Sequence, residues 1–170
     1  MSETENQPNS TDEDPTDLDG VLDADGSPTP QIDIQFQYIK DLSFENPVGP
    51  AAPKFVQQNP EVNVQVSTSA RELGPAQYEV CLIIRGEARH EDTAVFIIEL
   101  TYGAGILLAN VPDDAVQAVL LIEGARQIFP FARNIVAEVT RDGGFPPLFL
   151  QPIDFVQLFQ DQHVSEMVEN

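Results

Sequence analysis

The residues with the most obvious chemical potential form one short segment, His90-Glu91-Asp92. An imidazole beside two carboxylates offers ligands for a metal ion and groups that can transfer protons. Neighbouring side chains in a strand or turn diverge, however, so these three groups do not readily converge on one ion or one substrate. We therefore interpret the segment as a polar turn between two strands.

The other candidates for catalysis stand alone. Cys81 is the only cysteine, which excludes an intrachain disulfide and a thiolate metal cluster, and no basic residue adjoins it to lower its pKa. His163 lies near the C-terminus, and Asp142 adjoins a predicted helix end. The lysines, Lys40 and Lys54, are remote from any glycine-bearing segment, which argues against a phosphate-binding loop. We expect no enzymatic activity, no cofactor and no metal site.

The N-terminal segment contains two acidic runs, at residues 17–20 and 23–26, that are similar to the start of calcium loops. Such a loop needs a glutamate at its twelfth position, where these runs have Pro28 and Ile34. Residues 1–30 carry nine carboxylates, no lysine or arginine, and almost no aliphatic side chains. We expect them to form a disordered acidic extension, because they cannot bury enough apolar surface to offset the entropy of ordering.

Charge limits the range of partners. The 170 residues include 28 acidic and 8 basic side chains, for a formal net charge of −20. Such a surface repels phosphate groups, so a basic protein surface is a better partner than nucleic acid or an anionic membrane. The sequence has no signal-peptide pattern and no uncharged apolar run of about 18 residues. We expect a cytoplasmic protein that does not insert into the membrane.

Alternating apolar and polar residues predict four strands of an antiparallel sheet, within one folded domain of residues 31–162. The chain after that domain, residues 163–170, is expected to be a flexible tail. The predicted inward face of the first strand consists of Ile32, Ile34, Phe36, Tyr38, Leu42 and Phe44. Its opposite face is polar and carries Asp41 and Glu45.

The other three strands follow the same rule of one apolar and one wet face. The second strand alternates at Val62, Val64 and Val66. The third and fourth strands meet at the polar turn, and their predicted inward residues are Tyr78, Val80, Leu82, Ile84 and Ala88, then Ala94, Phe96, Ile98 and Leu100. Residues 102–107, which include two glycines, are interpreted as a crossing that leaves the sheet.

Three helices are expected after the sheet. The first ends at Gly124, and the second runs from Gln127 to Arg141, with Pro130 just inside its start. Gly143 and Gly144 would end that helix through positive φ. An apolar loop follows, and Asp154 would cap a last helix.

This inventory predicts an α+β fold in which a four-stranded antiparallel sheet carries helices on one face. One sheet offers a single apolar face, yet three helices and two aromatic loops all carry apolar surface that must be buried. The surplus apolar surface indicates either contacts between subunits or a bound ligand.

Five runs of residues together resemble one known family, the SecB protein-export chaperones. They are KDLSFENP at 40–47, YEV at 78–80, FPFAR at 129–133, GFP at 144–146 and PIDF at 152–155. The runs occur in the family's order and extend over about residues 32–160.

The resemblance implies an ATP-independent chaperone that binds unfolded preproteins in apolar grooves and delivers them to SecA, the translocase motor. It also implies a homotetramer built as a dimer of dimers, with helices between two sheets. The SecA-binding residues implied by position are Asp41, Glu45, Ile97 and Glu99. The groove residues inferred from position are Phe55, Val56, Tyr102, Ile106, Phe129, Phe131, Phe145 and Leu148.

Two alternatives remain open at this stage. The first is a SecB-like chaperone dedicated to a single client such as an antitoxin. The second is a small sheet-and-helix enzyme acting on an acyl ligand, which would need a polar constellation in its cleft. The sequence shows no such constellation.

Overall fold

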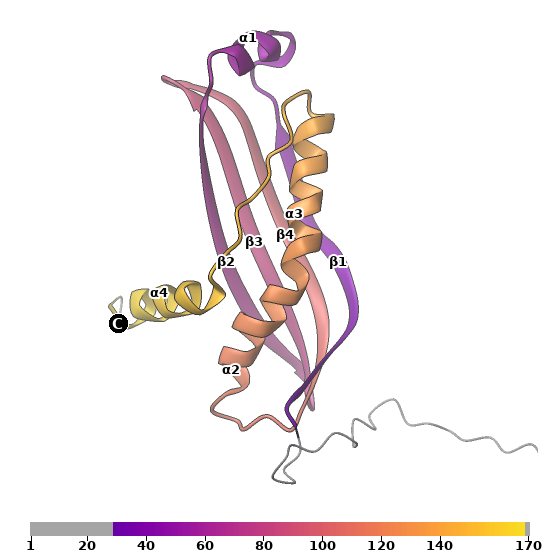
Figure 1. Ribbon diagram of the computed structural model, residues 1–170. Helices are drawn as coiled ribbons and strands as arrows, with labels where there is room; N and C mark the ends of the chain where they lie inside the picture. The colour runs from indigo at the N-terminus through magenta and orange to yellow at the C-terminus, as the bar shows by residue number, and fades with distance from the viewer. Residues whose placement is uncertain (1–28, 169–170) are drawn as a thin grey trace, which may run out of the picture.

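The computed structural model describes residues 29–168, which form a long, twisted antiparallel sheet with helices on one face (Figure 1). The strands are β1 (Gln31–Glu45), β2 (Glu61–Gly74), β3 (Gln77–His90) and β4 (Thr93–Ala109). Their order in the sheet is β1-β4-β3-β2, so β1 and β2 are its edges. The predicted polar turn is confirmed, because Glu91 and Asp92 connect β3 to β4. The calcium-like runs at 17–20 and 23–26 and most of the acidic extension lie outside the described residues.

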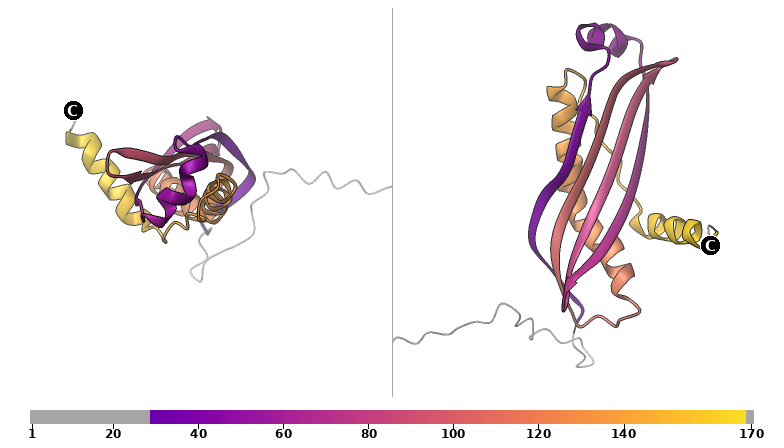
Figure 2. Two further views of the ribbon diagram at one scale, coloured as in Figure 1. Left: turned by 90° about the horizontal axis from the view of Figure 1, so that it is seen from above. Right: turned by 180° about the vertical axis from the view of Figure 1, so that it is seen from behind.

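The helices cover one face of the sheet, and Figure 2 shows the described strands uncovered on the other. A short 3-10 turn, η1 (Gly49–Ala51), and α1 (Ala52–Gln57) connect β1 to β2. A helical run along the sheet consists of α2 (Val116–Val119), η2 (Leu120–Gly124) and α3 (Ala125–Asp142), and α4 (Phe155–Val168) ends the described chain. Within the described part, no helix is long and apolar enough to cross a membrane.

The core lies between this helical layer and the covered face of the sheet. It contains the predicted inward residues of the central strands, including Leu82, Ile84, Ile98 and Leu100, all nearly inaccessible to solvent. Phe145, from the loop after α3, packs against Phe96 at a ring-centroid distance of 5.0 Å. The loop thus contributes to the core, as expected of an apolar segment that follows an amphipathic helix.

The prediction that Phe36 and Tyr38, in the middle of β1, face inward was wrong. Register shifts lie between Ile34 and Phe36 and between Ile39 and Asp41, so strict alternation fails twice. An extra residue in one strand turns every following side chain to the other face. Phe36 and Tyr38 consequently lie on the uncovered outer face, opposite Gly105 and Gly103 of β4.

A crossing out of the sheet at residues 102–107 was also wrong, because β4 continues through them to Ala109. Gly103 and Gly105 are sheet residues whose missing side chains leave room for two rings. A Cβ on Gly105 would lie 2.5 Å from the Phe36 ring, and one on Gly103 would lie 2.8 Å from the Tyr38 ring. The bulges in β1 thus turn the two rings to the outer face, and the glycines in β4 leave room for them there.

The predicted helix boundaries also need correction. The run does not stop at Gly124 but continues through η2 into α3, so Pro130 lies inside a helix rather than near a start. Gly124 lies close to the sheet, since a Cβ there would be 2.9 Å from the Cδ1 of Ile106. Pro130 cannot donate a backbone hydrogen bond, so packing of the buried face sustains the helix there. Ile128 and Ala132, on either side of Pro130, are fully buried.

The predicted end of α3 and start of α4 are confirmed in part. Gly144 has φ +91°, as expected, whereas Gly143 is helical and close to the Phe44 ring. Asp154 caps α4, because its Oδ1 accepts hydrogen bonds from the amides of Val156 and Gln157 at 3.0 and 3.1 Å. Helix α4 also extends past residue 163, where a flexible tail was expected to begin.

A buried carboxylate holds the bulged strand to its neighbours. Glu79 on β3 is only 5% exposed, and it accepts hydrogen bonds from Tyr38, from Lys40 at 2.8 Å and from Arg71 at 2.5 Å. The guanidinium of Arg71, followed by the Lys40 ammonium and the Tyr38 hydroxyl, lowers the pKa of Glu79 to about 2. The hydrogen bond that Tyr38 donates to Glu79 raises the pKa of Tyr38 to about 12.

These contacts predict acid sensitivity in a defined window. The folded pKa of Glu79 is below its ordinary value of 4.5, so its stabilisation is complete above that value and is lost as the pH falls toward 2. Lys40 and Arg71 are partly exposed, which limits the contribution to the order of 2 kcal/mol. We expect Glu79→Gln to lower stability at pH 7 and to flatten the urea-unfolding profile between pH 4.5 and 2. The control is Glu123→Gln, which removes a solvent-exposed ion pair; equal profiles for both variants would contradict the assignment.

Candidate functional site

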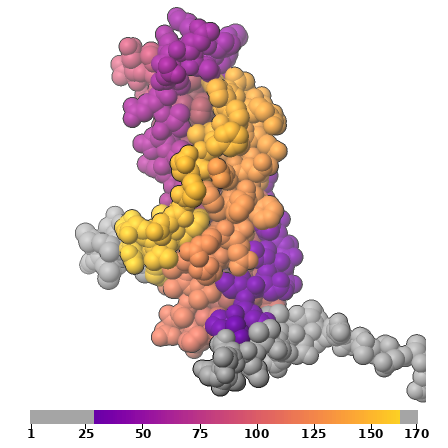
Figure 3. Space-filling view, in the orientation of Figure 1, coloured from indigo at the N-terminus to yellow at the C-terminus, as the bar shows by residue number. Residues whose placement is uncertain are grey.

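A groove lies between the edge strand β2 and the extended segment that connects α3 to α4. It encloses about 350 Å³, and its lining residues are Val62, Val64, Val66, Leu148, Phe149, Leu150, Gln151, Pro152 and Ile153. Val62 is 42% exposed and Phe149 is 62% exposed, so large apolar side chains face solvent along it. Figure 3 shows the connecting segment (yellow-orange) on the surface between α3 (orange) and the strands on its other side (purple). The groove is thus open, apolar and bounded by a strand.

The connecting segment is held in place by side chains in the core. The hydroxyl of the fully buried Thr140 accepts a hydrogen bond from the Leu148 amide at 2.9 Å and donates toward the carbonyl of Val136 at 2.8 Å. Leu148 then lies over Gly86 of β3, where an added Cβ would be 3.4 Å from its Cδ2. The segment therefore approaches the sheet closely at a position without a side chain.

Among the described residues, no strand pairs with the outer edge of β2 beside this groove. At Thr68 the amide donates to the side-chain Oε1 of Gln162 at 3.2 Å, and the carbonyl accepts from its Nε2 at 3.0 Å. Both backbone groups of Thr68 therefore point away from β3. Since this direction repeats every second residue and the register from 61 to 72 is continuous, the backbone groups of Val62, Val64 and Val66 point outward too.

The structure separates the eight residues predicted to line a groove. Leu148 is the one that lines the groove described above. Phe55 and Val56 are half-buried in α1, near the start of β2 (Figure 1). Phe131 is 51% exposed on α3. The other four are buried in the core: Tyr102, Ile106, Phe129 and Phe145.

The valines of β2 were missed as groove residues, although their alternation was recognised. On a strand they would ordinarily pack beneath a helix, and nothing in the sequence shows that β2 lies beyond the reach of α3. The exposed Phe149 and the Pro152-Ile153 pair follow a stiff apolar run, which was the available indication of a groove wall.

The four residues predicted to contact SecA lie together on the uncovered face. Glu45 is directly opposite Ile97, and Ser43 is opposite Glu99, while Asp41 is opposite Thr101. Glu99 also accepts from the Arg85 guanidinium at 3.0 Å. The result is an acidic patch around one half-buried isoleucine, across β1 and β4.

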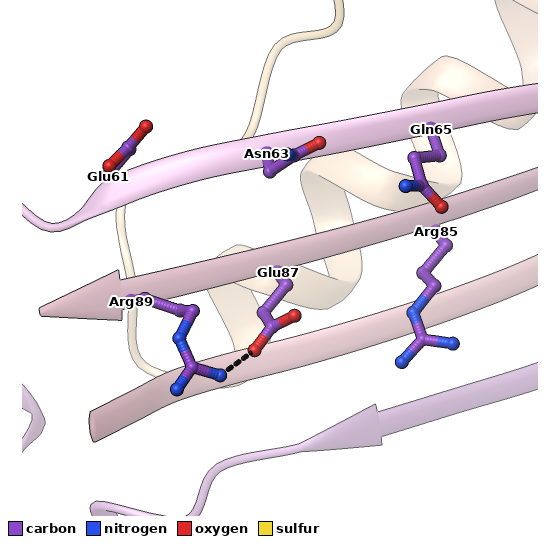
Figure 4. A pocket seen from close by; sticks show the side chains of 6 residues that line it. All are labelled: Glu61, Asn63, Gln65, Arg85, Glu87 and Arg89. Carbon is purple, nitrogen blue, oxygen red and sulfur yellow. Dashed lines mark hydrogen bonds and ion pairs between the residues drawn. The ribbon is translucent and has the colours of Figure 1, made fainter. Parts of the chain in front are cut away.

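A polar hollow of about 280 Å³ adjoins this patch on the same face, and Figure 4 shows its lining side chains on β2 and β3. They are Glu61, Asn63, Gln65, Arg85, Glu87 and Arg89. Arg89 pairs with Glu87 at 2.5 Å, so the arginine is balanced by a neighbouring acid. The polar face and the apolar groove are thus opposite sides of the same edge strand.

Two of the isolated catalytic candidates, His90 and Cys81, lie nine residues apart on β3, and the side chain of His163 lies outside the described residues. His90 packs edge-on against Phe55, with 6.1 Å between ring centroids. Cys81 is buried, and burial raises the pKa of its thiol even though the Lys40 ammonium lies 3.8 Å away, a contact that sequence neighbours did not indicate. Among the described residues, no group of three or more His, Cys, Asp or Glu side chains could hold a metal ion.

Comparison with known proteins agrees with this architecture. Residues 25–166 match the family model described as preprotein translocase subunit SecB. The protein-export protein SecB of Azorhizobium caulinodans is 46% identical over 145 residues, covering 83% of this chain and 91% of the relative. That of Paramagnetospirillum magneticum is 49% identical over 132 residues, covering 77% and 84%.

A solved structure shares the fold at low sequence identity. It is the Mycobacterium tuberculosis Rv1957 SecB-like chaperone in complex with a ChAD peptide from the Rv1956 HigA1 antitoxin. The TM-score is 0.58 at 12% identity, with 72% of this chain and 87% of that chain covered. Family match, relatives and fold all agree: the chain belongs to the SecB family of protein-export chaperones.

Proposed function

We propose that unfolded preproteins bind in the groove beside β2 as an added strand. The observation that carries this proposal is the coincidence of outward backbone groups and groove-facing side chains at Val62, Val64 and Val66. An extended polypeptide can hydrogen-bond to such an edge whatever its sequence, while every second side chain enters the apolar groove. A chaperone for many clients needs this combination.

The energetics favour weak, repeated binding. Burying one aliphatic client side chain contributes about 2 kcal/mol, and each backbone hydrogen bond adds about 1 kcal/mol. Affinity for a long client then comes from several grooves on one assembly, since binding at the first raises the effective concentration at the others. Because client binding needs no covalent step, the chain would act without ATP hydrolysis or other catalysis.

The mycobacterial neighbour in complex with an antitoxin peptide supports peptide binding by this fold. It also supports the alternative of a single dedicated client. The relatives with high identity are protein-export proteins, which favours preprotein export in the cytoplasm over the single-client function.

For delivery, we propose that SecA binds the acidic patch of Asp41, Glu45, Ile97 and Glu99. The patch combines carboxylates with one half-buried apolar side chain on a face that no described helix covers. Charged rims around an apolar contact increase association rates and favour a basic partner. Client and motor would then bind different parts of one sheet, the β2 edge and the outer face of β1 and β4.

We also propose a homotetramer arranged as a dimer of dimers. Phe131 on α3 is 51% exposed, and on β1, the edge strand opposite β2, Ile39 and Leu42 are 48% and 37% exposed. Gln37 on the same strand has a buried Oε1 without a hydrogen-bond partner among the described residues. Exposed apolar side chains beside an unsatisfied buried oxygen are typical of a surface that another subunit covers.

The groove is tested by adding a charge to one face of β2 at a time. Val64→Asp places a carboxylate in the groove, and we expect it to raise the Kd for an unfolded preprotein about 10-fold or more because the charge loses solvation. Asn63→Asp is the matched control, since it adds the same charge to the outer face of the same strand. Fluorescence titration with a labelled preprotein measures both; equal affinities for the two variants would sink the groove assignment.

The acidic patch is tested by charge reversal. We expect Glu45→Lys to weaken SecA binding about 10-fold at low salt, with preprotein binding unchanged, because a like charge then faces the basic partner. Asp113→Lys makes the same charge change at an exposed site away from the sheet and serves as control. Calorimetric titration with SecA measures the affinity of each variant. Unchanged SecA affinity in Glu45→Lys would exclude the acidic patch as the SecA-binding site.

The assembly is tested by mass. Light scattering should give four times the 18.7 kDa of one chain. Phe131→Glu should shift the mass toward dimers if α3 joins the two dimers, whereas Phe149→Glu, in the groove, should leave it unchanged. A monomeric wild-type protein would overturn the proposed assembly.

A further inference from the structure

The side chain of Gln162 occupies the place of a neighbouring strand at one position of the β2 edge. Its Oε1 accepts from the Thr68 amide at 3.2 Å and from the Thr68 hydroxyl at 3.0 Å, and its Nε2 donates to the Thr68 carbonyl at 3.0 Å. A primary amide carries the same donor and acceptor as a peptide group. Gln162 therefore forms with Thr68 the two bonds that a residue of a fifth strand would form.

Helix α4 holds this side chain in place. Phe155 at its start is 1% exposed and packs on Phe129 with 5.7 Å between ring centroids, and Leu158 packs against the core. Gln162 follows Leu158 by four residues and Phe155 by seven, so all three lie on the sheet-facing side of α4. A glutamine on an otherwise apolar stripe is explained by its contacts with the β2 backbone.

The open edge consequently has a defined end. The outward backbone groups of Val62, Val64 and Val66 are beside the groove, and the next outward position, Thr68, is occupied by Gln162. A strand added to this edge can pair with the three valines, but it cannot continue past Ser67 without displacing the amide.

We propose that Gln162 is a plug that ends the added client strand and sets its register on β2. This inference rests on the proposed strand addition and concerns how much of a client one groove accepts. With a fixed end, each groove holds a short segment, and the client chain must leave the edge at Thr68. Affinity for a whole client then depends on how many grooves it reaches, since binding at one groove raises the effective concentration at the others.

The test uses three synthetic peptides derived from one preprotein segment. The first is long enough to face residues 62–66, and each of the others adds four residues, at one end or the other. In the wild-type protein, neither addition should change the Kd more than twofold. In Gln162→Ala, the addition that continues past Thr68 should lower the Kd about 5- to 10-fold, because it forms new backbone hydrogen bonds. The other addition is an internal control, since β2 begins at Glu61.

Hydrogen exchange gives a second readout that does not depend on affinity. The Thr68 amide should exchange slowly in the free wild-type protein and faster in Gln162→Ala, and the longer peptide should restore its protection. Gln162→Glu is a second variant of similar size that cannot donate to the Thr68 carbonyl. Its carboxylate can still accept from the Thr68 amide, so that amide should stay protected in Gln162→Glu, whereas Gln160→Ala, exposed on the same helix, should behave as wild type.

The two levels of the proposal fail differently. If the shortest peptide binds but lengthening it changes the Kd equally in the wild-type protein and in Gln162→Ala, the plug is wrong and strand addition stands. If no peptide binds the wild-type protein, the proposed function fails and the plug with it.

Discussion

An edge strand exposes backbone amides and carbonyls that need partners, and this requirement organises much of the molecule. β1 and β2 both end the sheet, but they meet the requirement differently. The middle of β1 is bulged and tied to Glu79, which makes it irregular. β2 stays regular from 61 to 72, lies beside an apolar groove, and is closed at Thr68 by a side chain from α4. Such a regular edge beside an apolar surface is suited to an added strand.

The sheet separates two surfaces of different character. On β2 the valines face the groove, while Glu61, Asn63 and Gln65 belong to the polar face. The helical layer covers only one side, so the acidic patch on β1 and β4 stays accessible in the described part of the chain. Because neighbouring residues on a strand point in opposite directions, one thin sheet can present both surfaces without either intruding on the other.

Several core features serve to fix the groove wall. Thr140 binds the Leu148 amide, Gly86 lets Leu148 approach the sheet, and Phe145 anchors the loop in the aromatic cluster. Buried residues such as Phe145 thus act on the groove through the segment they hold. In the described chain these side chains are buried, and whether a client reaches them stays a prediction.

Sequence patterns were enough to predict the four strands over most of their length, the polar turn, the Asp154 cap and the family, because these depend on local periodicity and short motifs. The alternation also placed Asp41, Glu45, Ile97 and Glu99 on one face, since the bulges of β1 precede Asp41. Three features could be seen only in the folded chain: the outward orientation of Phe36 and Tyr38, the burial of Tyr102, Ile106, Phe129 and Phe145, and the hydrogen bonds between Gln162 and Thr68. These depend on contacts between segments far apart in the chain. A bulge is stabilised by glycines on the neighbouring strand, and an edge is closed by a residue from the last helix, so no local pattern reveals either.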